Sequence, residues 1–110
     1  MAEKLTKSVF AENLNTRFDL LHPVRKVDLE LSEVESLSAD PDDDDSFSLV
    51  FVAPGREYFE QAIYPVEHEK LGAFELFLVP IRQDAGGVYY QAIFNRMTIR
   101  PLQKKAAGGG

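Results

Sequence analysis

The sequence predicts a mainly β domain, namely a small antiparallel barrel or curled sheet of about six strands with one short N-terminal helix. Short runs of alternating apolar and polar residues recur along the chain, as expected for strands with one buried face. The connections between the runs are short and rich in Gly, Pro, Asp and Ser, and leave no room for helical crossovers. Such connections favour antiparallel neighbours.

The densest apolar stretch, residues 71–96, predicts a central β-hairpin. Its first half is apolar on both sides of an extended chain, so we expect burial on both faces, with Phe77 in the core. Pro80 cannot donate to a sheet ladder and predicts a bulge or the end of pairing there. Residues 84–87 (DAGG) have the composition of a tight turn, after which residues 88–95 alternate again.

The other elements follow from the same patterns. Residues 1–15 predict a short amphipathic helix with Thr6 as N-cap, which closes one end of a barrel or covers one sheet face. Apolar alternation slips by one position after Leu31, as a β-bulge produces. Pro65 predicts that the strand at residues 62–68 lies at a sheet edge. The remaining predicted strands cover residues 16–21, 27–37, 47–52 and, as a last short extended piece, 98–102.

The chain has 110 residues and a formal net charge of −6. Its length suits one domain, which we place at residues 1–102, followed by a loose tail at 103–110. The acidic balance argues against nucleic-acid or membrane partners. No leader-like segment and no apolar run long enough to span a bilayer is present, so a cytoplasmic location is expected.

No set of residues predicts catalysis, a cofactor or a metal. Cysteine is absent, and the nucleophile-elbow, phosphate-loop and dinucleotide motifs are missing. His22 and His68 are far apart, and the neighbours Glu67 and Glu69 would face the side of a strand opposite to His68. The aspartates at positions 40 and 42–45 do not fit a calcium-binding helix-loop-helix template. A solvated loop is predicted there, with weak Ca²⁺ association as the alternative.

Arg56, Tyr58 and Phe59 predict a partner-contact loop, because exposed arginine and aromatic residues are typical of interaction hot spots. The alternative is that one ring turns inward to cap the barrel.

Charge is also segregated: residues 28–45 carry nine acidic and no basic side chains, whereas 96–105 carry four basic and no acidic ones. This separation is typical of surface solubility with a solvated tail, and the alternative is that it steers a basic protein partner or a second copy of the chain.

The chain also resembles a bacterial family of small domains of unknown function. The resemblance is carried by EKLT near the start, DLELSEV, FSLVF, the block YPVEHEKLGAFELFLVPI, and YYQAIFNR. It covers nearly the whole chain, and the EHxxLGxFELFLVP signature is its most specific part. It implies no activity and no site residues. It implies genomic neighbours of phage-tail-like or collar type, and therefore a structural or assembly role. The aspartate run departs from the shorter loop expected for the family.

These features predict a non-enzymatic protein-interaction or assembly module. The family resemblance implies that this module is associated with a tail-like particle. The alternative is a β-barrel carrier of an apolar small molecule. A dry cavity among five large side chains would favour the carrier, whereas a filled interior would favour the module. The five residues are Phe18, Leu29, Phe51, Tyr90 and Phe94.

Overall fold

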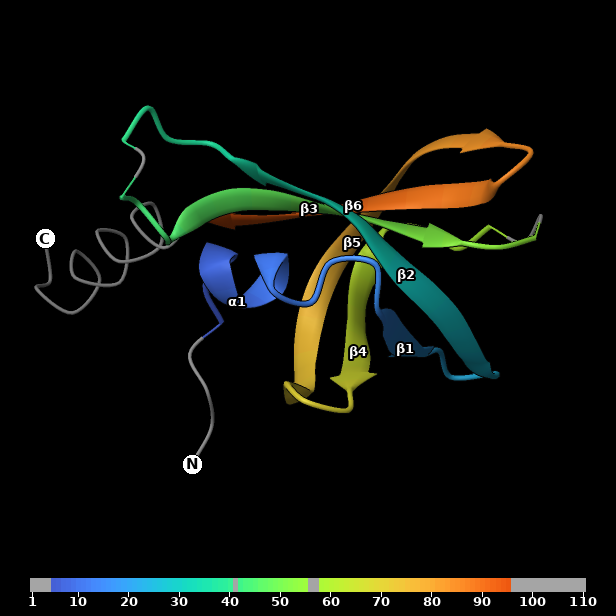
Figure 1. Ribbon diagram of the computed structural model, residues 1–110. Coiled ribbons are helices and arrows are strands. Elements are labelled where there is room, and N and C mark those ends of the chain that lie inside the picture. The colour runs from blue at the N-terminus through green and yellow to red at the C-terminus, as the bar shows by residue number, and fades with distance from the viewer. Residues whose placement is uncertain (1–4, 41, 56–57, 96–110) are drawn as a thin grey trace, which may run out of the picture.

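The computed structural model, which describes residues 5–40, 42–55 and 58–95, is a closed antiparallel barrel with a short helix at one end (Figure 1). The strands follow one another around the barrel in the order β1-β2-β3-β6-β5-β4. The predicted fold class is therefore confirmed. The elements are α1 (Lys7–Ala11), β1 (Arg17–Leu21), β2 (Lys26–Ser36), β3 (Ser46–Ala53), β4 (Ala62–His68), β5 (Gly72–Asp84) and β6 (Gly87–Asn95).

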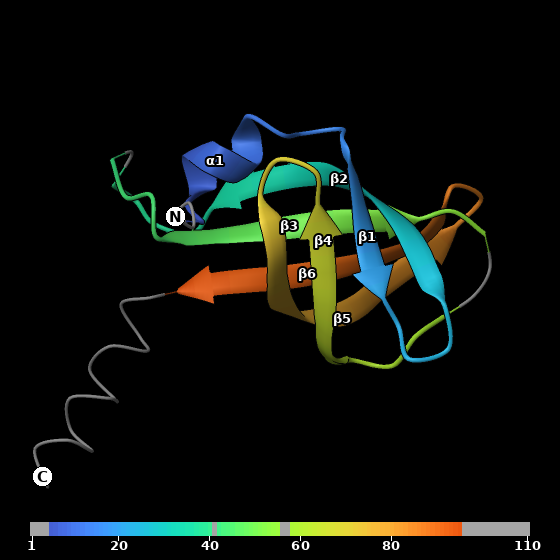
Figure 2. The same cartoon turned by 90° about the horizontal axis from the view of Figure 1, so that it is seen from below.

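Two bulges lie where the sequence predicts them. The β2–β3 register shifts between Leu31 and Glu33, and the β5–β6 register shifts between Pro80 and Arg82. A bulge adds a residue to one strand and increases its bend and twist, which helps a sheet to close. The result is visible in Figure 2, where β1 and β4 cross β3 and β6 at a steep angle.

The prediction that residues 62–68 form an edge strand is wrong. β4 pairs with β5 along its whole length, from Ala62–Leu78 to His68–Gly72, and also with β1 at two positions. Barrel closure leaves this strand a neighbour on each side. Pro65 is nevertheless compatible with it, because the pairing with β1 joins Val66 and Glu67 and Pro65 lies just outside it.

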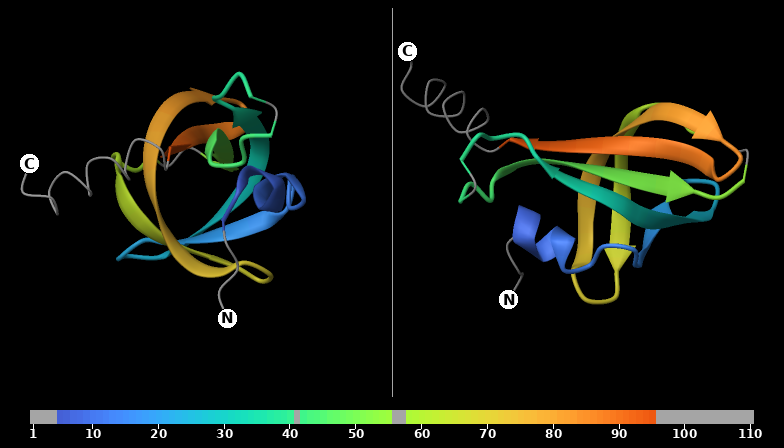
Figure 3. Two further views of the ribbon diagram at one scale, coloured as in Figure 1. Left: turned by 90° about the vertical axis from the view of Figure 1, so that its left-hand side faces the viewer. Right: turned by 45° about the horizontal axis from the view of Figure 1, so that its top comes forward.

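The left panel of Figure 3 shows the barrel end beside α1 end-on. An aromatic cluster closes this end. The fully buried ring of Phe10 lies with its centroid 5.5–6.2 Å from four other phenylalanine rings. These rings come from four different strands, so the side chain of Phe10 on α1 contacts four of the strands of the barrel. They belong to Phe18 (β1), Phe47 (β3), Phe74 (β5) and Phe94 (β6).

The N-terminus of α1 is fixed by two caps. Thr6 Oγ1 accepts a hydrogen bond from the Val9 N–H, as predicted, and Asp44 Oδ1 accepts from both the N–H and the hydroxyl of Ser8. Desolvation raises the pKa of Asp44, but the hydrogen bonds from Ser8, together with smaller effects of Thr6 and Lys7, lower it overall from its ordinary value. The aspartate segment is thus more than a solvated loop, because one member anchors the helix.

The expectation that β5 is buried on both faces, with Phe77 in the core, is wrong. Leu76 and Leu78 point inward and are buried, whereas Phe77 points outward and is half exposed. The strand buried on both faces is β3, including Ser48 and Val50. β3 is paired along its full length with β6 and from Phe47 to Val52 with β2, so long outward side chains of both neighbours can cover it.

The predicted extended piece at residues 98–102 and the predicted tail at 103–110 lie outside the described residues. The end of the predicted domain at residue 102 lies there too. None of the helices in the described ranges has the length and apolar character needed to cross a membrane.

Candidate interaction surface

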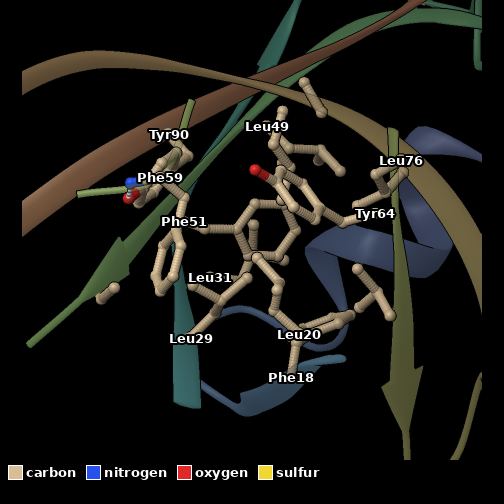
Figure 4. Close-up of a cluster of buried hydrophobic side chains, with 14 of the residues drawn as sticks. Phe18, Leu20, Leu29, Leu31, Leu49, Phe51, Phe59, Tyr64, Leu76 and Tyr90 are labelled. Carbon is tan, nitrogen blue, oxygen red and sulfur yellow. Dashed lines mark hydrogen bonds between the residues drawn. The ribbon is translucent and has the colours of Figure 1, made fainter. Parts of the chain in front are cut away.

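The interior of the barrel is filled by its own side chains (Figure 4). Phe18, Phe51 and Tyr90 are fully buried, and the rings of Phe18 and Phe51 lie edge to face with centroids 5.2 Å apart. Leu29 is also buried among them, and Phe94 packs against the same cluster. The five side chains that would have lined a ligand cavity therefore pack against one another and their neighbours.

The predicted contact loop is divided between the interior and the surface. Phe59 is buried at the barrel end opposite α1, where its ring packs against His22 and Tyr90. Its N–H donates to the hydroxyl oxygen of Tyr90 at 2.9 Å, which fixes the backbone of the loop as well. Tyr58 is exposed, and Arg56 lies outside the described residues. Phe59 thus occupies the capping position, and Tyr58 remains on the surface.

A row of apolar side chains covers the outer face of β4, β5 and β6. The exposed fractions are 64% for Ile63, 51% for Phe77, 42% for Ile81 and 61% for Ile93. Ile63 lies directly opposite Phe77 in the β4–β5 ladder. The β5–β6 ladder pairs the outward, half-buried Val79 with Gln91 and ends there, so Ile93 lies on β6 just beyond the last residue that pairs with β5. We call Ile63, Phe77, Ile81 and Ile93, with Val79 between them, the apolar outer face.

Sequence reasoning did not identify this surface. The signal was present, because residues 74–81 are apolar at odd and even positions alike. Alternation shows that a strand has two apolar faces, but not whether the second face meets another layer of the same chain. A closed barrel has only one interior, so the second apolar face of β5 is left in solvent.

The opposite wall of the barrel, formed by β1 and β2, carries acidic side chains. Asp19 lies directly opposite Asp28 on β2 and opposite Glu67 on β4. Arg17 offsets part of this repulsion, since its Nε lies 3.2 Å from Asp19 Oδ1 and 3.8 Å from Asp28 Oδ1. Asp28 and Glu30 are exposed and point away from the interior. The outer surface of the barrel is therefore acidic on one wall and apolar on the other.

His68 lies beneath a shallow hollow at the β4–β5 turn, but both ring nitrogens are engaged. Its Nδ1 accepts hydrogen bonds from the N–H groups of Lys70 and Leu71, at 3.0 and 3.3 Å. Nε2 must then carry the proton and donate to Thr16 Oγ1 at 2.9 Å, and the Thr16 hydroxyl donates to the Asn13 carbonyl at 2.6 Å. The imidazole is thus a structural tie between the turn, β1 and the C-terminus of α1.

This arrangement leaves His68 without a lone pair for a metal or for proton abstraction. Among the residues that the structure describes, no three His, Cys, Asp or Glu side chains gather closely enough to hold a metal ion. The hollow beside His68 is lined by charged side chains and by Thr16, whose hydroxyl is already engaged by His68 and the Asn13 carbonyl. The geometry of this region supports a packing role for His68.

We expect His68 to make folding stability depend on pH. Burial lowers its pKa below 6.5, while Glu69 and Asp19 act in the opposite direction and Lys70 in the same one. The unfolded chain therefore binds a proton more readily, so the contribution of the neutral imidazole is complete above pH 6.5. It is lost as the pH falls below 6.5 toward the lowered pKa of the folded state. Urea unfolding at a series of pH values measures this loss.

The control for that measurement is His68→Gln, which cannot titrate. The wild-type free energy of unfolding should fall more steeply than that of the variant between pH 6.5 and the lowered pKa. Parallel curves for the two proteins would show that protonation of His68 does not oppose folding.

Comparison with known proteins gives a family but no activity. The family model described as Domain of unknown function (DUF6916) matches residues 5–94, so the chain belongs to this family. No curated protein and no solved structure matches the chain significantly. The matched residues include the helix, nearly all of the barrel and the whole apolar outer face.

Proposed function

We propose that this member of the DUF6916 family is a non-enzymatic protein-interaction or assembly module that binds through its apolar outer face. The observation that carries the proposal is the exposure of Ile63, Phe77 and Ile93 on three neighbouring strands. Contiguous exposed apolar side chains are uncommon on proteins that remain monomeric, and they mark protein contact sites. Aromatic residues, phenylalanine included, are enriched at protein interfaces, and Phe77 supplies such a ring here.

The filled interior supports the module over the carrier. A carrier needs a hollow that takes up most of an apolar ligand, whereas Phe18, Phe51 and Tyr90 already pack against one another. The proposal of no enzymatic activity is supported by His68, since its two nitrogens are held by the turn and by Thr16. Both observations favour a contact surface over a catalytic site in this proposal.

The exposed Tyr58 extends the proposed surface, because its loop runs directly into β4, whose second residue is Ile63. The acidic wall of β1 and β2 would then act at a distance, by attracting a basic partner during encounter. A cytoplasmic location, expected from the sequence, and an association with tail-like particles, implied by the family resemblance, are part of this proposal. The identity of the neighbouring genes tests that association.

Affinity capture from the native host tests the function. We expect proteins captured by the wild-type chain to be lost with Phe77→Ser and retained with Val24→Ser. Val24 is the matched control because it is 79% exposed and lies between β1 and β2, away from the apolar outer face. Both variants remove one exposed apolar side chain, so only the position differs. Mass spectrometry that recovers the same proteins with both variants would show that this face is not the binding surface.

A further inference from the structure

The β4–β5 turn is held closed by a single ring nitrogen. His68 is the last residue of β4, and its Nδ1 accepts hydrogen bonds from the N–H groups of Lys70 and Leu71, at 3.0 and 3.3 Å. Both bonds use the one lone pair of Nδ1, which exists only while the imidazole is neutral. A second proton on the ring would occupy that lone pair and place a third N–H against the two N–H groups of the turn. Protonation of His68 therefore breaks both hydrogen bonds.

The other side of the ring does not depend on this lone pair. Nε2 of His68 donates to Thr16 Oγ1, and the Thr16 hydroxyl donates to the carbonyl of Asn13, which lies just after α1. The ring of Phe18 packs against the imidazole with its centroid 4.3 Å away. Nε2 carries a proton in both states of the ring, so these contacts hold the imidazole in place when the turn is released.

We propose that His68 is a pH-dependent switch, in which protonation of the ring releases the β4–β5 turn and opens the barrel end beside α1 while the remaining strands stay paired. The switch is independent of the proposed contact surface. Leu71 in the turn is partly buried against the core, and Phe74 follows at the start of β5 with its ring 6.1 Å from that of Phe10. Release of the turn therefore withdraws Leu71 from the core and loosens the apolar cover of the Phe10 ring.

The charges around the ring act in both directions. Burial lowers the pKa of His68 most strongly, and Lys70 in the turn acts in the same direction. Glu69 in the turn and Asp19 on β1 raise it. The other residues that line the hollow beside the ring are the charged Arg17 and Glu67 and the uncharged Thr16, Gly72 and Ala73. The closed turn thus favours the neutral ring, and opening removes the burial that opposes the charge.

Asp19 also favours the charged ring once the turn has opened. Its Oδ1 is buried and accepts no hydrogen bond from the described residues, and it forms an ion pair with Arg17 Nε at 3.2 Å. A buried carboxylate oxygen of this kind interacts more strongly with a neighbouring cation than a hydrated one does. The neutral ring is therefore stabilised by the turn, and the charged ring by the carboxylates of the hollow.

Hydrogen exchange of the full chain, followed by NMR from about pH 7.5 to about pH 5, tests the switch. The open turn binds one proton more than the closed turn, so protection of the Lys70 and Leu71 amides should fall about tenfold per pH unit below pH 6.5. The amides of β3, which is paired with β2 and β6, should remain more strongly protected at every pH. Equal protection of the turn and of β3 would show that the barrel opens only as a whole, which would overturn the switch.

His68→Asn is the decisive variant, because the asparagine Oδ1 can accept the same two N–H groups and does not titrate. The fall in protection at Lys70 and Leu71 should be lost. His22→Asn is the matched control, since His22 Nδ1 also accepts the N–H two residues later, that of Val24 at 3.1 Å, but between β1 and β2. This control should leave the fall unchanged.

A fall that persists in His68→Asn would overturn the switch. If that variant does not fold, nitrogen-15 NMR of the wild-type ring replaces it, because the shift of Nδ1 reports its protonation directly. Nδ1 of His68 should then gain its proton over the same pH range in which the Lys70 and Leu71 amides lose protection. Loss of protection while Nδ1 stays unprotonated would overturn the switch as well.

Discussion

Replacing Phe10 by alanine should lower the free energy of unfolding by about 3–5 kcal/mol, which is most of the stability of a domain this small. The Phe10 ring is fully buried and lies within 6.2 Å of the rings of Phe18, Phe47, Phe74 and Phe94. Truncation would leave a cavity bordered by four strands and one helix. Because these rings are anchored on separate strands, they cannot all move inward to fill it.

The matched control is Phe77→Ala, which removes the same atoms from the outer face of the barrel. Half of the Phe77 side chain is already in solvent, so its loss should cost less than about 1 kcal/mol when unfolding is measured at low protein concentration. Urea denaturation of the two variants compares them directly. Equal destabilisation by the two variants would have one of two meanings. Either Phe10 on α1 does not complete the core, or the outer face around Phe77 is covered in solution.

The local features of the fold could be predicted from the sequence because each depends on nearby residues. Thr6 caps α1, the alternation slips where the bulge after Leu31 lies, and Pro80 begins the second bulge. The turn at residues 84–87 joins β5 and β6. In each case the chemistry of one or two side chains restricts the backbone there, and no distant contact is needed to decide the outcome.

The features that the sequence did not predict depend on closure of the barrel. The outward position of Phe77 follows from the single interior, and the pairing of β4 on both sides follows from the meeting of the first and last strands of the sheet order. The sequence predicts that Asp44 lies in a solvated loop, whereas the fold places its carboxylate against the N–H and hydroxyl of Ser8. Alternation alone gives no information about such contacts between distant segments.

Replacing Gly87 by alanine should cost at least about 3 kcal/mol, the second large effect that the structure predicts. Gly87 has φ +135°, a conformation that side-chain-bearing residues rarely adopt. A Cβ there would also overlap the Ala53 carbonyl oxygen and lie 2.9 Å from the carbonyl carbon. Both obstacles are backbone atoms, because the start of β6 lies against the end of β3, where Ala53 pairs with Val88.

Gly86→Ala is the matched control in the same turn. A Cβ at Gly86 would lie 3.2 Å from Asp84 Oδ1 and from the Tyr89 hydroxyl oxygen, and both atoms are ends of side chains that can move aside. Its cost should stay below about 1 kcal/mol. Urea unfolding of the pair separates the two effects. Equal stability of the variants would mean that β6 can begin without the close approach to Ala53.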